Sequence, residues 1–316
     1  MKTRLYFIVS VLLCCAACRH AVMPPAASNG RSAPLFTYVL DDGNDTDYLV
    51  ALEVFSGQGA VACTAITTDW IGKGDHLTAG QIRSLRDAGW EIMSHTATHP
   101  HLTSLTEDRI DEELARSKTM LESLGVTVRN IVYPYNQNDE LVRRVASKYY
   151  RSGRGGTYAV NYPDTDPYFL KSYSFKHDLE DMKRTIDQAY QHRAWLIVYQ
   201  HEMDVKIAVT AREGKFIPGE QLHFSPSGAE GRYEAPAWFQ YFGSMYVVPL
   251  SGTPQPGDSV RGMTSKAAAR LDHYVYDDRA AVSELIRYVR TAHPDMRIVT
   301  IDQGLDILGM AKKNTN

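Results

Sequence analysis

The sequence has few cysteines, no excess of one charge and a single long apolar run. Three of the four cysteines lie in the first 18 residues, so Cys63 stands alone in the rest of the chain and an intrachain disulfide is excluded there. The formal net charge is only −3, and basic and acidic residues are interspersed. This balance argues against a nucleic-acid partner and against a polybasic membrane patch. With 44% hydrophobic residues, the fold must be stabilised by a large buried core.

The one long apolar run lies at the N-terminus, where Lys2 and Arg4 precede LYFIVSVLLCCAAC. It is too short for a stable membrane-spanning helix and is typical of a signal peptide, so we expect residues 1–18 to direct export. Its end, CCAAC, resembles a bacterial lipobox and predicts lipidation of Cys18, which would anchor the protein in the cell envelope. Ordinary cleavage, giving a periplasmic or secreted protein, is the alternative. Residues 19–34 are rich in proline and small polar side chains and are expected to form a flexible tether.

From residue 35 onward, short apolar runs alternate with helical patterns. Repeated strand-helix units predict a mainly parallel sheet with helices outside it, either open or closed into a barrel. The pattern is interrupted at 205–272, which is rich in Gly, Pro, Ser and aromatic residues, and it returns afterwards. We therefore expect one domain over 35–204 and 273–316 with a mostly-β insertion at 205–272. Helices are expected near 45–55, 78–88, 106–124, 139–147, 179–192, 278–292 and 302–310.

Two histidines and an acidic pair follow predicted strands. His95 and His99 come just after the strand WEIMS, four residues apart, a spacing at which two imidazoles can converge on one cation. Asp41 and Asp42 follow the strand LFTYVL. A carboxylate from this second strand would complete three protein ligands and leave an open position for water, as catalytic metal sites do.

Four segments occur in a fixed order: LDDG with Asp41 and Asp42, HTATH from His95 to His99, VYPYN, and LIVYQH ending at His201. Their order and spacing resemble the polysaccharide deacetylases of carbohydrate esterase family 4, the nodulation-type chitooligosaccharide deacetylase homology domain. The resemblance covers roughly residues 35–203 and 278–310. It implies an α/β fold, an irregular (β/α) barrel with fewer than eight strands, to which the mostly-β insertion is added.

The resemblance also implies a role for each motif residue. A divalent cation, most plausibly Zn²⁺ for two nitrogens and one oxygen, would be held by Asp42, His95 and His99. Asp41 would be the general base and His201 the general acid, while the backbone N–H of Tyr135 would face the developing oxyanion. Pro134 fixes the chain next to Tyr135, and both would contact substrate.

Many family members carry an arginine in the third motif that orients the catalytic aspartate, but this chain has Val132 there. A branch of the family lacks that arginine too. Arg154, in YYRSGRGG, is the best substitute partner for Asp41; the alternative is that it merely occupies a glycine-rich turn. In the insertion, Tyr233 and Trp238 could stack on sugar rings, although the aromatics there are more often the core of the module itself.

Several polar residues near the motifs have simpler interpretations. Asp45 and Asp47 are expected to open the helix after LDDG, with Asn44 or Asp45 as its cap. Asp69 is expected in a turn or at a helix cap. His101, one residue beyond the second motif, is expected at the surface or behind the ligands, not on the metal.

The leading functional prediction is a metal-dependent N-deacetylase that acts on an N-acetylated polysaccharide or oligosaccharide. An O-acetyl esterase acting on a glycan such as acetylxylan is the close alternative, because the same site would cleave an ester more easily than an amide. A catalytically silent glycan-binding protein of the envelope is the third. The complete set of motif residues favours an enzyme. The expected partner is an acetylated glycan, and membrane contact would come only through the lipid anchor.

Overall fold

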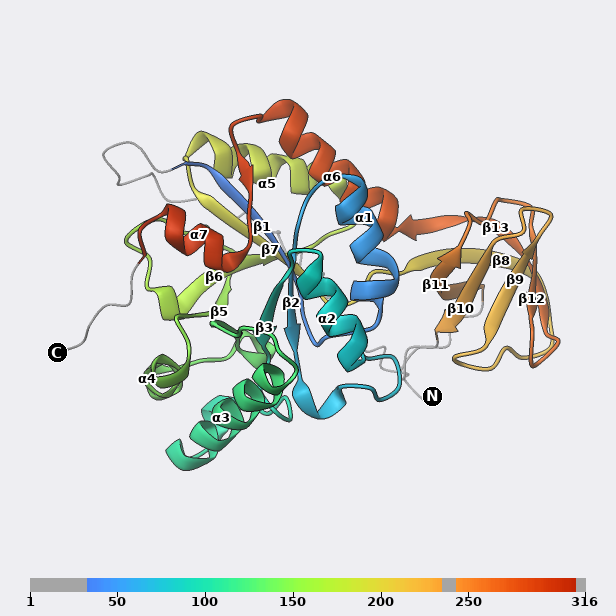
Figure 1. Cartoon of the computed structure of the whole chain (residues 1–316). Helices are drawn as coiled ribbons and strands as arrows, with labels where there is room; N and C mark the ends of the chain where they lie inside the picture. Colours follow the sequence, from blue (N-terminus) through green and yellow to red (C-terminus); the bar gives the residue numbers. More distant parts are fainter. Residues whose placement is uncertain (1–32, 235–242, 311–316) are drawn as a thin grey trace, which may run out of the picture.

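The computed structural model describes residues 33–234 and 243–310. Within these ranges the chain forms two closed barrels, a larger parallel one and a smaller antiparallel one that lies to one side of it (Figure 1). Residues 1–18, with Cys18, most of the predicted tether, and Trp238 lie outside the described residues. No helix in the described part of the chain has both the length and the apolar character needed to cross a bilayer.

The larger barrel contains seven parallel strands in chain order, closed by the pairing of β1 with β7. A short additional strand, β14, pairs with the start of β1, while β2 pairs with its end. The predicted irregular barrel with fewer than eight strands is therefore confirmed. Its strands are β1 (Leu35–Leu40), β2 (Cys63–Ile66), β3 (Glu91–Ser94), β4 (Asn130–Val132), β5 (Ser152–Thr157), β6 (Leu170–Ser174), β7 (Trp195–Gln200) and β14 (Arg297–Ile298).

The helices pack around the outside of this barrel (Figure 1). They begin and end close to the expected positions, except that a π-helical turn (η1, Asp47–Ala51) precedes the first α-helix. Thr78 and Thr300 each open a helix through a reciprocal capping box. The α-helices are α1 (Leu52–Gly57), α2 (Ala79–Asp87), α3 (Glu107–Ser123), α4 (Glu140–Tyr149), α5 (Leu179–Gln191), α6 (Asp278–Ala292) and α7 (Ile301–Ile307).

Alternation along the strands decides which side chains reach the site. In β1, Leu35 and Val39 belong to one apolar cluster together with Trp195, whereas Phe36, Tyr38 and Leu40 belong to the cluster that packs against α1 to α6. Side chains alternate between the two faces of a strand, so the residue directly after each of these strands points to the same side as Leu35 and Val39. Asp41, His95 and His201 therefore have the same parity as the inner face, at the carboxyl ends of their strands.

Two strands of the larger barrel, β5 and β6, were not predicted. β5 contains three glycines, SGRGGT, which look like a turn in the sequence. The glycines are required by packing, because a β-carbon at Gly153 or Gly155 would overlap the buried ring of Tyr133. Arg154 lies between them, fully buried within the strand.

The inserted segment forms the smaller barrel, with strand order β10-β11-β8-β13-β12-β9. Its core is a separate apolar cluster that includes Ile207, Phe224, Val247 and Tyr233. The last strand runs to Asp277, past the expected boundary at 272, because it leads directly into α6. Its strands are β8 (Val205–Glu213), β9 (Gln221–Ser225), β10 (Glu230–Glu234), β11 (Ser244–Ser251), β12 (Ser259–Gly262) and β13 (Ala268–Asp277).

The chain crosses between the barrels twice, and polar groups join the two crossings. Asp278 N–H donates to the carbonyl oxygen of Asp204 at 3.1 Å, and Asp204 N–H donates to Asp278 Oδ2 at 3.3 Å. The same Asp278 oxygen accepts from Gln200 Nε2 at 2.6 Å. The end of β7, the start of β8 and the start of α6 are thus fixed to one another beside the site.

Candidate metal centre and active site

Three side chains that follow β1 and β3 converge on one point. Asp42 Oδ1 lies 3.2 Å from His95 Nε2 and 3.4 Å from His99 Nε2. One ligand atom from each residue lies within 4.8 Å of the other two. His95 is buried, while Asp42 and His99 are partly exposed, so the cluster is open to solvent on one side. The structure brings together the three residues predicted to hold a metal.

The donor set fits a divalent cation. Asp42 Oδ1 is buried but has no hydrogen-bond partner among the described residues. His95 Nδ1 lies 2.8 Å from the carbonyl oxygen of Val132, a contact that leaves Nε2 directed toward Asp42. Two imidazole nitrogens and a carboxylate oxygen, with one side open, match the ligand set of catalytic zinc.

The ionisation of these groups also suits a cation. Burial raises the pKa of Asp42, but the neighbouring imidazoles of His95, His201 and His99 outweigh this effect and lower the pKa to about 2. Burial and the adjacent His95 lower the pKa of His99 to about 4. At neutral pH the carboxylate is therefore ionised and the His99 imidazole is neutral, so both have lone pairs available to a metal.

The turn between the two histidine ligands is tied to α3. The carboxylate of Glu113 accepts hydrogen bonds from Ala97 N–H at 3.0 Å, Thr98 N–H at 2.9 Å and the Thr98 hydroxyl at 2.8 Å. The sequence analysis missed Glu113, although a signal was present. It lies on the same helical stripe as Ile110 and Leu114, where a buried carboxylate requires partners.

Asp41 is buried next to the site and faces Arg154. Nη2 of Arg154 donates to both carboxylate oxygens of Asp41, and Nη1 donates to Asn136 Oδ1. The guanidinium lies 4.5 Å from the centre of the Tyr199 ring, and Asn136 Nδ2 donates to Tyr199 Oη at 3.1 Å. The alternative that Arg154 occupies a turn is therefore wrong. Arg154 thus contacts Asp41 from β5, whereas Val132 stands at the third-motif position.

Pro134 and Tyr135 lie in a short 3-10 turn after β4 (η4, Pro134–Asn136). Pro134 is buried, whereas 52% of the Tyr135 surface is exposed. The Tyr135 ring meets His99 edge-on with 4.6 Å between ring centres and stacks on His101 at 3.9 Å. His101 is exposed and its Nδ1 lies 2.9 Å from Gln137 Oε1, so it belongs to the surface around Tyr135 and not to the ligand cluster.

His201 follows β7 with an exposed side chain. Asn44 Nδ2 donates to the carbonyl oxygen of His201 at 3.2 Å and to that of Asp41 at 3.3 Å, which joins the ends of β1 and β7. His201 contributes to the lowered pKa values of Asp42 and His99, so it lies within electrostatic reach of the ligand cluster.

Left-handed backbone conformations gather at this site. Non-glycine residues with positive φ there are Asp42 (77°), Thr96 (69°), His99 (62°), Tyr135 (57°) and Asn136 (55°). Each such residue costs on the order of 1–3 kcal/mol and persists only where surrounding contacts impose it. Backbone strain at three of the predicted site residues is therefore a second, independent sign of function.

Of the two acidic residues expected to open the first helix, Asp47 lies in the first turn of η1 as predicted, but neither Asn44 nor Asp45 is its cap. Asp45 is paired with Arg232 of the smaller barrel, its Oδ2 2.6 Å from Nη1 and its Oδ1 2.9 Å from Nη2. Asp47 is fully buried and accepts from the Thr64 hydroxyl at 2.6 Å, and burial raises its pKa. Thr46 stands at the cap position without a side-chain cap bond.

Tyr233 does not present its ring to a substrate. Only 8% of its surface is exposed, and it packs in the core of the smaller barrel, 5.8 Å from the ring of Phe216. The predicted stacking of Tyr233 on sugar is therefore wrong, because the module needs this ring for its own core. Asp69 lies in a 3-10 turn (η2, Thr68–Trp70) as expected, and it pairs with Arg116 on α3 at 2.8 Å.

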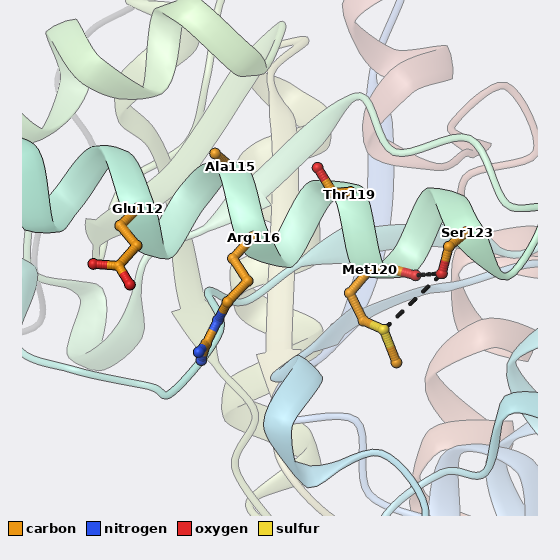
Figure 2. Close-up of a pocket in the computed structure, with 6 residues that line it drawn as sticks. All are labelled: Glu112, Ala115, Arg116, Thr119, Met120 and Ser123. Atoms are coloured by element: carbon orange, nitrogen blue, oxygen red, sulfur yellow. Dashed lines mark hydrogen bonds between the residues drawn. The ribbon is translucent and has the colours of Figure 1, made fainter.

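A surface hollow elsewhere contains none of the predicted site residues. It follows one side of α3, as Figure 2 shows, and is lined by Glu112, Ala115, Arg116, Thr119, Met120 and Ser123. These positions recur at helical spacing along one face, so the hollow belongs to a single helix surface. It does not extend the metal cluster.

Comparison with known proteins finds similarity in the N-terminal part of the larger barrel. Residues 30–151 match the model of the polysaccharide deacetylase family. YxkH of Bacillus subtilis, named for the same family, is 30% identical over 109 residues, which are 34% of this chain and 39% of YxkH. Chitin deacetylase 1 of Cryptococcus neoformans is 34% identical over 86 residues, 25% of this chain and 18% of that protein. The chain thus spans less than half the length of either relative.

Among solved structures, a polysaccharide deacetylase from Bacillus cereus is 26% identical, with a TM-score of 0.40 over 43% of this chain and 45% of that one. A family 4 carbohydrate esterase from Streptomyces lividans, solved with acetate, is 20% identical, with a TM-score of 0.39 over 54% of this chain and 80% of that one. The family match includes Asp41, Asp42, His95, His99 and Tyr135, but it ends before Arg154 and His201. Residues 30–151 are therefore similar to the polysaccharide deacetylase family.

Proposed function

We propose that this protein is a metal-dependent hydrolase that removes acetyl groups from an N-acetylated polysaccharide or oligosaccharide. The observation that carries the proposal is the pairing of two adjacent carboxylates with different partners. Asp42 faces the imidazoles of His95 and His99, while Asp41 is buried against Arg154. One carboxylate is placed to bind a cation and the other to accept a proton.

A divalent cation, which we propose to be Zn²⁺ held by Asp42, His95 and His99, would polarise the acetyl carbonyl and acidify a water molecule. Asp41, oriented by Arg154, would take the proton from that water. The backbone N–H of Tyr135 would stabilise the negative charge that develops on the carbonyl oxygen. His201 would give a proton to the departing amine, and its exposure leaves it accessible to a bulky glycan.

The test is a panel of glycans assayed by acetate release, with and without a chelator. N-acetylglucosamine oligomers, an N-acetylated polysaccharide and acetylxylan are compared with the purified protein after loading with Zn²⁺. We expect release from the N-acetylated substrates that stops with chelator and returns with the metal. The matched control is His95→Ala, which should release no acetate because a metal ligand is missing.

Each outcome decides between the alternatives. Metal-dependent release from acetylxylan alone would replace the N-deacetylase with an ester hydrolase. Binding of a glycan without release from any substrate would favour a glycan-binding protein on the same fold. Release that survives complete removal of the metal would contradict the proposed chemistry.

We also propose that the protein is exported and anchored through a lipid on Cys18, as the N-terminal sequence predicts. The test is metabolic labelling of the full-length chain with a fatty-acid analogue, compared between the wild type and Cys18→Ala. We expect label and membrane association only with the cysteine. An unlabelled wild-type protein in the soluble exported fraction would contradict the anchor.

A further inference from the structure

We propose that Glu113 is a positioning residue for the metal centre: its carboxylate shapes the turn between His95 and His99 so that both imidazoles meet Asp42. The inference rests on the metal site of the proposed function, and it concerns the affinity for metal rather than the reaction. Glu113 belongs to α3 and touches no ligand directly. It acts through the backbone of the turn.

All four backbone N–H groups from Thr96 to His99 donate to side-chain oxygens. Thr96 N–H reaches Ser94 Oγ at 3.3 Å, and His99 N–H reaches Thr96 Oγ1 at 3.0 Å. The two central N–H groups both reach Glu113 Oε2, at 3.0 and 2.9 Å. One carboxylate thus satisfies half of the turn's donors, and its other oxygen accepts the hydroxyl of Thr98. Charged acceptors make the stronger of such bonds.

The turn needs this support because its backbone is strained. Thr96 and His99 both adopt left-handed conformations, which β-branched and bulky residues rarely take. Thr96 N–H is bonded to Ser94 at the end of β3, while the bond of His99 N–H to Thr96 lies within the turn and moves with it. The carbonyl oxygens of Thr96 and Ala97 accept from the N–H groups of Thr68 and Asp69 at 3.2 and 3.0 Å, so η2 (Thr68–Trp70) holds one side of the turn. Glu113 is the contact that fixes the two central N–H groups to α3.

The helix that carries Glu113 is itself fixed in register. Tyr150 Oη donates to the carbonyl oxygen of Leu114 at 2.9 Å and lies 2.9 Å from Ser94 Oγ. Ser117 Oγ lies 2.8 Å from the same Ser94 oxygen. Ser94 is the last residue of β3, directly before His95. The carboxylate is therefore held at a fixed place relative to the strand that presents the first ligand.

Loss of the carboxylate would leave the two central N–H groups without their acceptor and allow the turn to relax. His99 would then depart from its position beside His95, while Asp42 and His95 would keep theirs. Groups that orient metal ligands from behind typically change metal affinity by ten- to hundredfold when removed. We expect an effect of about that size, well short of the complete loss expected from His95→Ala.

The experiment measures the affinity for Zn²⁺ by competition with a chromogenic chelator, without any glycan. Glu113→Ala should weaken binding by about ten- to hundredfold. Glu113→Gln should retain most of the affinity, because the amide oxygen can accept both N–H groups and the amide nitrogen can donate to the Thr98 hydroxyl. Glu112→Ala is the matched control, since this exposed neighbour pairs only with Arg109 among the described contacts; it should bind as the wild type does.

Thermal unfolding of each metal-free variant shows whether it is folded at the assay temperature. If Glu113→Ala does not fold, Glu113→Asp replaces it: the carboxylate is then one methylene shorter and cannot reach both N–H groups, so affinity should still fall. Wild-type affinity in a folded Ala or Asp variant would overturn the proposal, as would an equal loss in Glu113→Gln. Normal Zn²⁺ binding without acetate release from any glycan would refute the proposed function and leave this inference standing.

Discussion

The larger barrel keeps Asp41, Arg154 and His95 buried at the carboxyl ends of its strands, whereas the buried carboxylates of the smaller barrel close its own turns. Glu220 accepts from the N–H groups of Thr264 and Ser265 at 3.1 and 2.9 Å, and Asp258 accepts from Gln255 and Ser227 in the same way. In the larger barrel these polar groups lie at or beside the candidate metal cluster, whereas in the smaller barrel the carboxylates accept from the backbone of its own loops. Burial of a polar residue does not identify a site until its partners are known.

The largest effect on acetate release is expected from substitution of Asp41, because the smaller barrel has no counterpart of this carboxylate among the described residues. Asp41→Asn removes the proposed base while leaving the metal ligands in place, so acetate release should fall by about 10²- to 10⁴-fold. Zn²⁺ binding should be unchanged. Asp47→Asn is the matched control, because burial raises the pKa of Asp47 and an amide resembles its neutral carboxyl. Full activity in Asp41→Asn would show that the base lies elsewhere.

Substitutions of Tyr233 and Tyr135 compare a tyrosine in the core of the smaller barrel with one beside the candidate site. Tyr233→Ala opens a cavity in the core of the smaller barrel, and the free energy of unfolding of that barrel should fall by about 3–5 kcal/mol. Denaturant unfolding followed by hydrogen exchange would locate the loss in β8 to β13, with Zn²⁺ binding retained.

Tyr135→Ala removes a half-exposed ring and should change the free energy of unfolding by no more than about 0.5 kcal/mol, while lowering acetate release. If Tyr233→Ala reduced activity without loss of stability, the ring would contact substrate after all. The two tyrosines would then have to exchange roles.

The sequence predicted the larger barrel better than the contacts that connect it to the smaller one. Helices α2 to α6 follow clear periodicity and appear within two residues of their expected limits. β5 was missed because its glycines are demanded by the ring of Tyr133, a residue distant in the sequence. The prediction for Asp45 failed for the same reason, a partner distant in the sequence. The local pattern indicated a helix cap, but Asp45 pairs with Arg232 of the insertion.

For the site, motif order placed Asp42, His95 and His99 together, and the missing arginine led to Arg154. Glu113 carried a local signal, a carboxylate on an apolar helix stripe, that became meaningful only once the turn it contacts was visible. Asn136 and Tyr199, which contact Arg154, had no such signal in the sequence, because Arg154 lies on a strand that was not predicted. Sequence motifs therefore reveal candidate site residues more readily than the residues that position them.

The junction between the barrels should respond to pH through Asp204. Burial and the nearby charge of Asp278 raise the pKa of Asp204 to about 7, from about 4 in the unfolded chain. The folded state therefore binds this proton more tightly, so the stabilisation is full below about pH 4 and is lost as the pH rises through 7. The free energy of unfolding should fall by up to about 1.4 kcal/mol per pH unit in this window.

Asp204→Asn mimics the protonated carboxyl and should remove this part of the pH dependence. The measurement is urea unfolding of both proteins at intervals from pH 4 to pH 8, taking the difference between them to cancel the other titrating groups. A constant difference across the range would mean that Asp204 does not titrate there.

The smallest effect is expected at the ion pair between Asp45 and Arg232, which crosses from one barrel to the other three residues after Asp42, the proposed metal ligand. Both side chains are partly accessible, at 11% and 21% of their surfaces, so the pair is screened more than a buried one would be. A double-mutant cycle with Asp45→Ala and Arg232→Ala should give a coupling free energy of about 1–2 kcal/mol, lower at high salt. Lys206→Ala, on the same barrel but with its amine over the Tyr246 ring, is the control and should show no coupling to Asp45. If the Arg232 variant also lost affinity for Zn²⁺, the smaller barrel would help to hold the first motif in place. The proposed site would then depend on both barrels.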